Sequence, residues 1–357
     1  MNLHPARDAT GRALSRVPGP GAITIALGVA AALGGAALYN RAQARRAERD
    51  NPPVGRFLEV DGTRLHYLDE GPADAATTGV GEEPPVVLLH GNTVTLDDWI
   101  VSGVFDLIAC SRRVVAFDRP GFGYSERPRD RSWTPAAQAR LLRRACRRLG
   151  VERPVVVGHS WATLVALAWA LQAPQEVAGL VLASGYYYPS RRLDVVLATP
   201  GAVPLLGDVL NHTVSPPLTQ MTLPGILRRM FAPRPVPNRF SAVFPRALIS
   251  RPGQIRAMSQ EGAIMVPSAA ALRRHYGGFS CPSMLMTGEA DRVVDPEDQS
   301  IRLAHELNDA ELRIIPGAGH MFHHAVPLEM AEAINRVASG RGRRQEVTSC
   351  AGRHQSS

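Results

Sequence analysis

The stretch that decides the fold is Val155-Val156-Val157-Gly158-His159-Ser160-Trp161-Ala162-Thr163. Its β-branched run predicts a buried strand, and the apolar residues at helical spacing that follow it predict a helix. A tight turn between them places Ser160 at its apex, with the small residues Gly158 and Ala162 on either side. A serine hydroxyl is a weak nucleophile, so catalysis needs it exposed, fixed and near a base. The stretch therefore predicts a nucleophilic serine, with a serine that only caps the helix as the alternative.

Four further segments each place polar residues directly after a short apolar strand. They are Val86 to Asn92, Val114 to Ser125, Met284 to Asp291 and Ile314 to His320. In this order and spacing, the five segments resemble the α/β-hydrolase superfamily over about Val54 to Ala338. The resemblance implies an α/β fold: a mostly parallel, doubly wound sheet with an inserted helical cap. It also implies a catalytic triad in the chain order serine, aspartate, histidine.

The resemblance gives the three triad positions. Ser160 is the expected nucleophile, although Ala162 stands where the family usually has a second glycine. His320 is the expected general base, because it follows a glycine-rich turn after a strand. Asp291 is the expected acid that orients the histidine, because it ends a Gly-x-x-Asp sequence that begins at Gly288.

Neighbouring residues are alternatives for two of these roles. His323 and His324 compete with His320, and we expect them to be supporting or surface residues. His159 is adjacent to the serine in sequence, so its side chain points away from the hydroxyl and is expected to be packed. The alternatives for the acid are Asp295 and Asp298.

The expected oxyanion hole consists of the backbone amides of Asn92 and Trp161. The same two residues look like the halide-binding pair of haloalkane dehalogenases. Those enzymes use an aspartate nucleophile, whereas attack by Ser160 on an alkyl halide would leave a stable ether. We interpret Asp118 and Arg119, which end another strand, as a structural loop bonded to the core.

The serine therefore favours acyl chemistry on a small-molecule or lipid-like ester through an acyl-enzyme, with no metal or organic cofactor. A proline iminopeptidase-like peptidase and a cofactor-free perhydrolase use the same triad and are the alternatives among enzymes. A non-catalytic member of the fold that binds a ligand is the alternative of a different class. It would have no need of Asp291 and His320.

A second strong feature is the uncharged stretch from Gly21 to Tyr39. As a helix it would be about 28 Å long, close to the thickness of the hydrocarbon core. Arginines flank it, and Tyr39 stands where an interfacial aromatic residue is found. The stretch predicts a single-pass membrane helix. A cleaved signal peptide with secretion is the alternative, although Arg41 separates the apolar run from the small-x-small sequence at residues 42–44.

These features divide the chain into consecutive parts. We expect a disordered N-terminus (1–20), a transmembrane anchor (21–39), a charged linker (40–53), two parts of the hydrolase core (54–185 and 281–339) separated by a helical cap (186–280), and a disordered tail (340–357).

Composition excludes little else. The net charge is +8, and all 40 basic residues are arginine. Such charge suits an anionic membrane or nucleic acid, but no nucleic-acid motif accompanies it, so we expect no nucleic-acid partner. The four cysteines have no metal-ligand or redox spacing.

Overall fold

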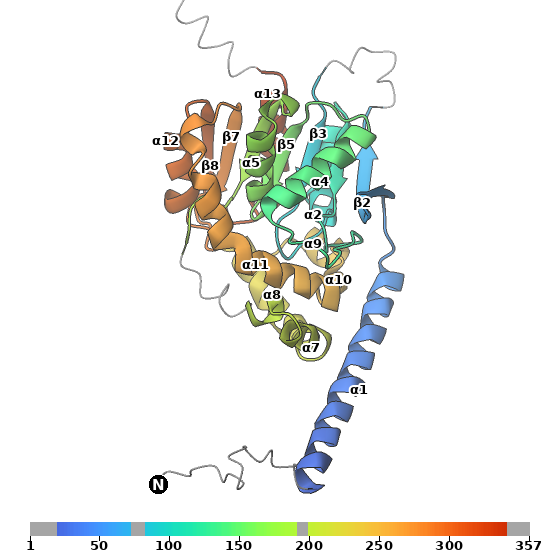
Figure 1. Cartoon of the computed structure of the whole chain (residues 1–357). Coiled ribbons are helices and arrows are strands. Elements are labelled where there is room, and N and C mark those ends of the chain that lie inside the picture. Colours follow the sequence, from blue (N-terminus) through green and yellow to red (C-terminus); the bar gives the residue numbers. More distant parts are fainter. Residues whose placement is uncertain (1–19, 73–82, 191–198, 341–357) are drawn as a thin grey trace, which may run out of the picture.

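The computed structural model describes residues 20–72, 83–190 and 199–340 (Figure 1). Within them, eight strands form one sheet in the order β1-β2-β4-β3-β5-β6-β7-β8. The pairs β1–β2 and β2–β4 are antiparallel, and the other pairs are parallel. The strands are β1 Arg56–Val60, β2 Thr63–Glu70, β3 Val86–Leu89, β4 Val114–Phe117, β5 Val155–His159, β6 Gly179–Ala183, β7 Ser283–Gly288 and β8 Ala310–Ile315.

The predicted first hairpin is confirmed. Val60 pairs with Thr63, so Asp61 and Gly62 form a two-residue turn. Both turn residues have positive φ, 50° and 69°, as a tight hairpin of this length requires.

Helices cover both faces of the sheet, as the alternation of strands and helices predicts. On one face lie α4 Pro135–Arg148, α5 Ala162–Gln172 and α12 Arg302–Glu306. On the other lie α2 Asp97–Ser102, α3 Val104–Ala109 and α13 Pro327–Ala338. Thr134 caps α4 by accepting a hydrogen bond from the Ala137 amide. Helices α2 and α3 are separate, because Gly103 adopts φ 84° between them.

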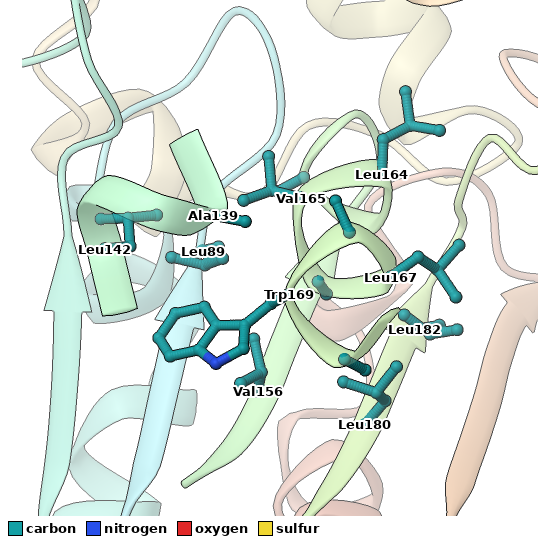
Figure 2. Packing of buried hydrophobic residues seen from close by; sticks show 14 of the residues in the cluster. Leu89, Ala139, Leu142, Val156, Leu164, Val165, Leu167, Trp169, Leu180 and Leu182 are labelled. Atoms are coloured by element: carbon teal, nitrogen blue, oxygen red, sulfur yellow. The ribbon is translucent and has the colours of Figure 1, made fainter. Parts of the chain in front are cut away.

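The core explains why the central strands are continuously apolar. Strands β3, β4, β5 and β6 are buried along their whole length, since helices pack on both sides. Figure 2 shows α5 lying across this layer, with its Trp169 ring beside Leu89 of β3 and Val156 of β5. The rigid layer fixes the turn that joins β5 to α5.

An all-helical segment is inserted between β6 and β7. It comprises α7 Leu206–His212, α8 Ser215–Phe231, α9 Asn238–Val243, α10 Arg246–Ile249 and α11 Pro252–Arg273, preceded by the short turn Thr199–Ala202. We call these elements the helical insertion. It corresponds to the part of the chain for which a cap is expected, and it has its own apolar contacts around Phe231 and Phe240.

The N-terminal helix differs most from expectation. Helix α1 runs without a break from Pro20 to Asp50, through most of the segment expected to be a linker. Residues 41–49 consist of alanine, arginine, glutamine and glutamate, which are good helix formers, so the helix continues. Among the described residues, this helix alone is long and apolar enough to cross a membrane, over Ile23–Asp50, and a signal sequence would meet the same test.

The β5–α5 turn depends on a residue without a side chain at Gly158. A Cβ added there would lie 2.8 Å from the Ala162 carbonyl oxygen and 2.9 Å from the Thr163 amide nitrogen, which are both backbone atoms.

We therefore expect Gly158→Ala to lower the free energy of unfolding by roughly 1–3 kcal/mol and to displace the turn, as measured by chemical denaturation. Gly262→Ala is the control, because nothing lies within 4 Å of the added methyl group in helix α11. That change should leave stability equal or raise it by up to about 1 kcal/mol. Equal effects of the two substitutions would contradict this account of the turn.

Candidate active site

Ser160 lies at the junction of β5 and α5 in a strained conformation. Its φ of 56° is in the left-handed region, which a serine rarely adopts. Gly91 from the loop after β3 approaches closely, since a Cβ on it would lie 3.1 Å from the Ser160 Cβ. The serine is only 6% exposed. The strand, the helix and the Gly91 loop together fix the hydroxyl at one position, which is the arrangement expected of a reactive serine.

The structure brings the three predicted side chains into one chain of contacts. The Ser160 Oγ lies 2.9 Å from His320 Nε2, and the other ring nitrogen, Nδ1, lies 2.8 Å from Asp291 Oδ2. His320 is 1% exposed, and the Asp291 carboxyl is fully buried. These distances are within hydrogen-bond range, so a proton can pass from the serine to the imidazole while the carboxylate holds the ring.

Asp291 is held by its own loop, whereas the alternative acids are not aimed at the histidine. Its Oδ1 accepts hydrogen bonds from the backbone amides of Val293 and Val294 at 2.7 and 2.9 Å. Asp295 instead caps the following helical turn, and Asp298 is exposed. Of the three aspartates, the geometry couples only Asp291 to His320.

The other histidines form a supporting network behind His320. The His159 Nε2 lies 3.1 Å from the His320 backbone oxygen, and its ring centre is 4.6 Å from that of His323. Asp98, at the start of α2, contacts His323 Nε2 at 3.0 Å and His324 Nε2 at 2.8 Å. His159 is packed and points away from the serine hydroxyl, as expected. His323 and His324 are not surface residues, because the buried Asp98 holds both.

The protonation states in this network follow from burial and from neighbouring charge. Burial, followed by the nearby His323 and His320, lowers the pKa of His159 well below its usual range. Burial also lowers the pKa of His323, although Asp98 partly opposes it. Burial alone would raise the pKa of Asp98, but the two histidines outweigh it and lower that pKa. A neutral His323 therefore donates to an ionised Asp98.

Within the described residues, Asp98, His323 and His324 form a cluster of side chains of the types that bind metal ions. The ligand atoms of Asp98, His323 and His324 lie within 4.8 Å of one another. Their mutual hydrogen bonds at 2.8 and 3.0 Å account for the arrangement as a polar network. We therefore keep the sequence-based expectation of catalysis without a metal.

Asp118 and Arg119 belong to the structural loop after β4, as expected. Asp118 contacts His66 Nδ1 at 2.6 Å and accepts bonds from the Leu96 and Tyr124 amides. Arg119 donates to the backbone oxygens of His90 and Gly91, at 2.7 and 3.1 Å. Arg119 therefore holds the loop that carries Asn92.

Sequence reasoning missed a buried carboxylate, Glu261 on helix α11. It lies 2.5 Å from Arg119 Nη1, and both side chains are fully buried. Gln138 donates to it at 2.9 Å, and Arg127 lies 3.8 Å away. One signal was present in the sequence: Glu261 is the only acidic residue between Asp208 and Glu289. A lone carboxylate in a basic helical segment indicates a specific partner.

Glu261 also engages the two predicted oxyanion residues through their side chains. The Trp161 indole donates to the Glu261 backbone oxygen at 3.0 Å. The Asn92 side-chain amide lies 3.4 Å from both the Glu261 carboxylate and the Met258 backbone oxygen. The Arg119 guanidinium lies 4.9 Å from the centre of the Trp161 ring. Both residues are therefore tied to α11 through their side chains.

The comparisons with known proteins agree with this architecture. Residues 84–325 match the family model described as alpha/beta hydrolase fold, which is more than half of the chain. The chain belongs to the α/β-hydrolase family. Haloalkane dehalogenase 2 of Mycobacterium tuberculosis is 27% identical over 297 residues, which cover 79% of this chain and 94% of that protein. The 2-hydroxymuconate semialdehyde hydrolase of Pseudomonas putida is 26% identical over 307 residues, covering 82% and 95%.

A solved structure extends the comparison to the fold. A membrane phospholipase A, described as a bacterial virulence factor, superimposes with a TM-score of 0.58 at 23% identity. The superposition covers 89% of this chain and 95% of the phospholipase chain. This α/β hydrolase therefore shares its fold with enzymes of several specificities, and fold alone does not choose among them.

The first prediction from this site concerns the buried ion pair. Glu261→Ala leaves Arg119 without its carboxylate in the interior, so we expect the free energy of unfolding to fall by roughly 3–5 kcal/mol. Turnover should fall as well, because Arg119 holds the Asn92 loop.

Chemical denaturation and steady-state kinetics of the folded fraction measure the two effects. Glu176→Ala is the matched control, since it removes the partly exposed partner of Arg143. That change should cost about 1 kcal/mol or less. A stability loss for Glu261→Ala no larger than that of the control would contradict a structural role for the pair.

The second prediction concerns pH. Burial lowers the pKa of His90 to about 3, and the pKa values of His159 and His323 are lowered too. Below about pH 6.5 these histidines bind protons in the unfolded chain while they stay neutral in the folded chain. The free energy of unfolding therefore falls, by about 1.4 kcal/mol per pH unit for each histidine that stays neutral. Burial raises the pKa of Asp97 to about 6, so that carboxyl gains a proton in the folded state and offsets one histidine.

We therefore expect a net loss of about 1.4 kcal/mol per pH unit or more between about pH 6 and pH 4, because His90 and His159 both stay unprotonated in the folded chain and Asp97 offsets one of them. Denaturation midpoints of the detergent-solubilised full chain at several pH values measure this slope. Stability that stays constant or rises over this interval would overturn the assignment of neutral buried histidines.

Proposed function

We propose that this α/β hydrolase is a membrane-anchored serine hydrolase that cleaves a carboxylic ester of lipid-like character. The observation that carries the proposal is the unbroken contact chain from the Ser160 Oγ through His320 to Asp291, at 2.9 and 2.8 Å. Neither a binding protein nor a structural protein requires this arrangement. The chemistry needs only these residues and water.

Acylation begins with the serine hydroxyl. His320 Nε2 accepts the hydroxyl proton as the Ser160 Oγ bonds to the ester carbonyl carbon. Asp291 holds the Nδ1–H and stabilises the imidazolium that forms. The tetrahedral intermediate then collapses, the ester C–O bond breaks, and the imidazolium gives its proton to the leaving alcohol. An acyl-enzyme remains on Ser160.

Deacylation repeats these steps with water. His320 removes a proton from the water as its oxygen bonds to the acyl carbon, and the collapse that follows releases the acid and restores the serine. In both steps the backbone amides of Trp161 and Asn92 stabilise the alkoxide oxygen. The Trp161 amide precedes the first turn of α5, where backbone N–H groups have no intrahelical acceptor.

Two observations argue against the dehalogenation performed by the haloalkane dehalogenase relatives. The nucleophile is Ser160, and an ether formed on it could not be hydrolysed. In addition, the side-chain donors of Asn92 and Trp161 already face Glu261. The buried carboxylate of Glu261 would repel a halide at this position. We therefore do not transfer the dehalogenase activity to this chain.

A peptidase that binds a free substrate amine is also disfavoured. Such a site needs an unpaired carboxylate near the serine. Residues 199–260 carry a single acidic residue, Asp208, and Arg129 pairs with it at 2.8 Å. Glu261 is engaged by Arg119. The basic helical insertion suits an ester or an anionic substrate better than a cationic one.

The lipid-like substrate class is supported by the anchor helix and by a structural neighbour. The membrane phospholipase A covers 89% of this chain, against 79% and 82% for the two sequence relatives. It is described as a membrane phospholipase A, and it has a TM-score of 0.58 with this chain. We propose the helical insertion as the cap over the site, which would exclude water and select the acyl chain.

We further propose that α1 is retained as a membrane anchor and is not cleaved as a signal peptide. The residues that follow its apolar part are integrated into the folded domain. The Asn40 side chain donates to the His212 and Thr213 backbone oxygens at 2.9 and 2.7 Å, and it is buried. Glu48 contacts Arg251 at 3.0 Å, and Ala47 is buried. Cleavage near residue 44 would remove the Asn40 contacts.

Hydrolysis of p-nitrophenyl esters of increasing acyl length tests the proposed reaction. Ser160→Ala and His320→Ala should each lower kcat by about 10⁴-fold or more, because each removes a reacting group. A fluorophosphonate probe should label the wild type and not Ser160→Ala.

Ser241→Ala, an exposed serine on α9, is the matched control and should retain full activity and labelling. Release of halide from haloalkanes should stay at background level for all variants. Ester hydrolysis that survives Ser160→Ala, or halide release that depends on Ser160, would overturn the proposed function.

A further inference from the structure

The helical insertion exposes an unusual set of large apolar side chains. They lie between the short turn Thr199–Ala202 and the end of α8, and Leu205 and Met221 are 81% and 80% exposed. We call this surface the apolar face. Its main members are Leu205, Leu206, Val209, Val214, Leu218 and Met221. Exposed large apolar side chains gathered on one segment in this number mark an interaction site, since solvated helices are usually polar on their outer side.

The segment that carries the apolar face is strongly basic. Residues 199–260 carry seven arginines and one acidic residue, Asp208, which is paired with Arg129. Arg228 and Arg229 are exposed on α8, the helix that also presents Leu218 and Met221. Apolar side chains combined with arginines are the pattern of a surface that lies at the interface of an anionic membrane.

Contacts between helix α1 and the helical insertion fix where the apolar face lies relative to the apolar part of α1. Asn40 donates to the His212 and Thr213 backbone oxygens, at the C-terminal end of α7. Helix α1 also contacts α10 and α11. The apolar part of α1 that precedes Asn40 is largely exposed, since Ile25, Leu27 and Leu38 are 66–70% exposed. Figure 1 shows this part extending past the insertion on the side of α7.

The hydrogen bond between Asn40 and Thr213 indicates how deep the apolar face would lie in a membrane. If residues 21–39 cross the hydrocarbon core, then Tyr39 and Asn40 lie at its boundary. Thr213 is within hydrogen-bond distance of Asn40, so the adjoining Val209 and Val214 lie at the same boundary. The apolar face then meets the lipid without any movement of the domain.

We propose that the apolar face of the helical insertion docks on the surface of an anionic lipid bilayer, beside the point where α1 crosses it. The docked insertion brings the catalytic domain to the membrane in one orientation, so that a lipid ester can enter the site under the cap directly from the bilayer. Burial of the apolar side chains and pairing of Arg228 with lipid headgroups stabilise this state. The proposal rests on the proposed anchoring by α1.

Quenching by lipids tests the docking in the full-length protein. Cys110 and Cys350 are replaced by serine, and a single Met221→Cys is labelled with an environment-sensitive fluorophore. The protein is reconstituted into vesicles of phosphatidylcholine and phosphatidylglycerol, with and without brominated acyl chains. The matched control is Glu152→Cys, an exposed position before β5 at the opposite end of the sheet.

We expect brominated lipid to quench the label at position 221 and not at position 152. Alkaline carbonate extraction of the same vesicles reports separately whether α1 is inserted. Release of the protein by carbonate would overturn the anchor, and the docking with it. A protein that resists carbonate, yet shows equal quenching at the two positions, would overturn the docking alone. Equal quenching at the two positions together with dimers on crosslinking would assign the face to a second copy of the chain.

Kinetics provide an independent test. The double change Leu218→Gln and Met221→Gln should lower hydrolysis of an ester presented in anionic vesicles by about ten-fold. Hydrolysis of a short soluble ester in detergent should stay unchanged, because neither residue belongs to the catalytic machinery. Leu328→Gln on α13 is the control for an exposed leucine outside the insertion and should change neither rate. An equal loss of rate on both substrates would overturn the docking proposal. Absence of ester hydrolysis by the wild type on either substrate would instead overturn the proposed function.

Discussion

The buried contact between Arg119 and Glu261 connects the two halves of this molecule. One partner follows β4 in the hydrolase core, and the other lies on α11 of the helical insertion. Arg119 also holds the His90–Gly91 loop, while the Glu261 backbone holds the Trp161 indole. A single desolvated ion pair therefore links the insertion, the loop that carries Asn92 and the residue after Ser160. Two charges remain in such an interior only when each satisfies the other.

The reactive serine depends on this support, since its own backbone conformation is unfavourable. A φ of 56° at Ser160 is retained because β5 and α5 are both packed into the core and because Gly91 and Gly158 leave room for the turn. His320 is held in a comparable way, by Asp291 on one side and by the His159, His323 and Asp98 network behind it. The site is built before substrate arrives, which is how enzymes avoid reorganisation in the transition state.

In the proposed membrane arrangement, helix α1 links the anchor to the catalytic domain as one continuous helix. A flexible linker would let the domain turn freely above the membrane. Here the helix continues past Asn40 and packs on the insertion, so the crossing point of the membrane and the position of the insertion are set together. The same insertion bears the apolar face and covers the region near Ser160 through Glu261, so the lipid surface and the active site are a short distance apart in the architecture.

The sequence alone determined the fold family and the order of the site residues. Local signals suffice for these: buried strands are continuously apolar, Asp61-Gly62 forms a hairpin turn, and Ser160, Asp291 and His320 each follow a strand whose end points to one edge of the sheet. Tertiary structure decided what depends on partners distant in the chain. Glu261 and Arg119 are 142 residues apart, and Asn40 and Thr213 are 173 apart, so no local pattern pairs them. The burial of His323 and the apolar face of the insertion were likewise fixed by packing between segments, which periodicity does not encode.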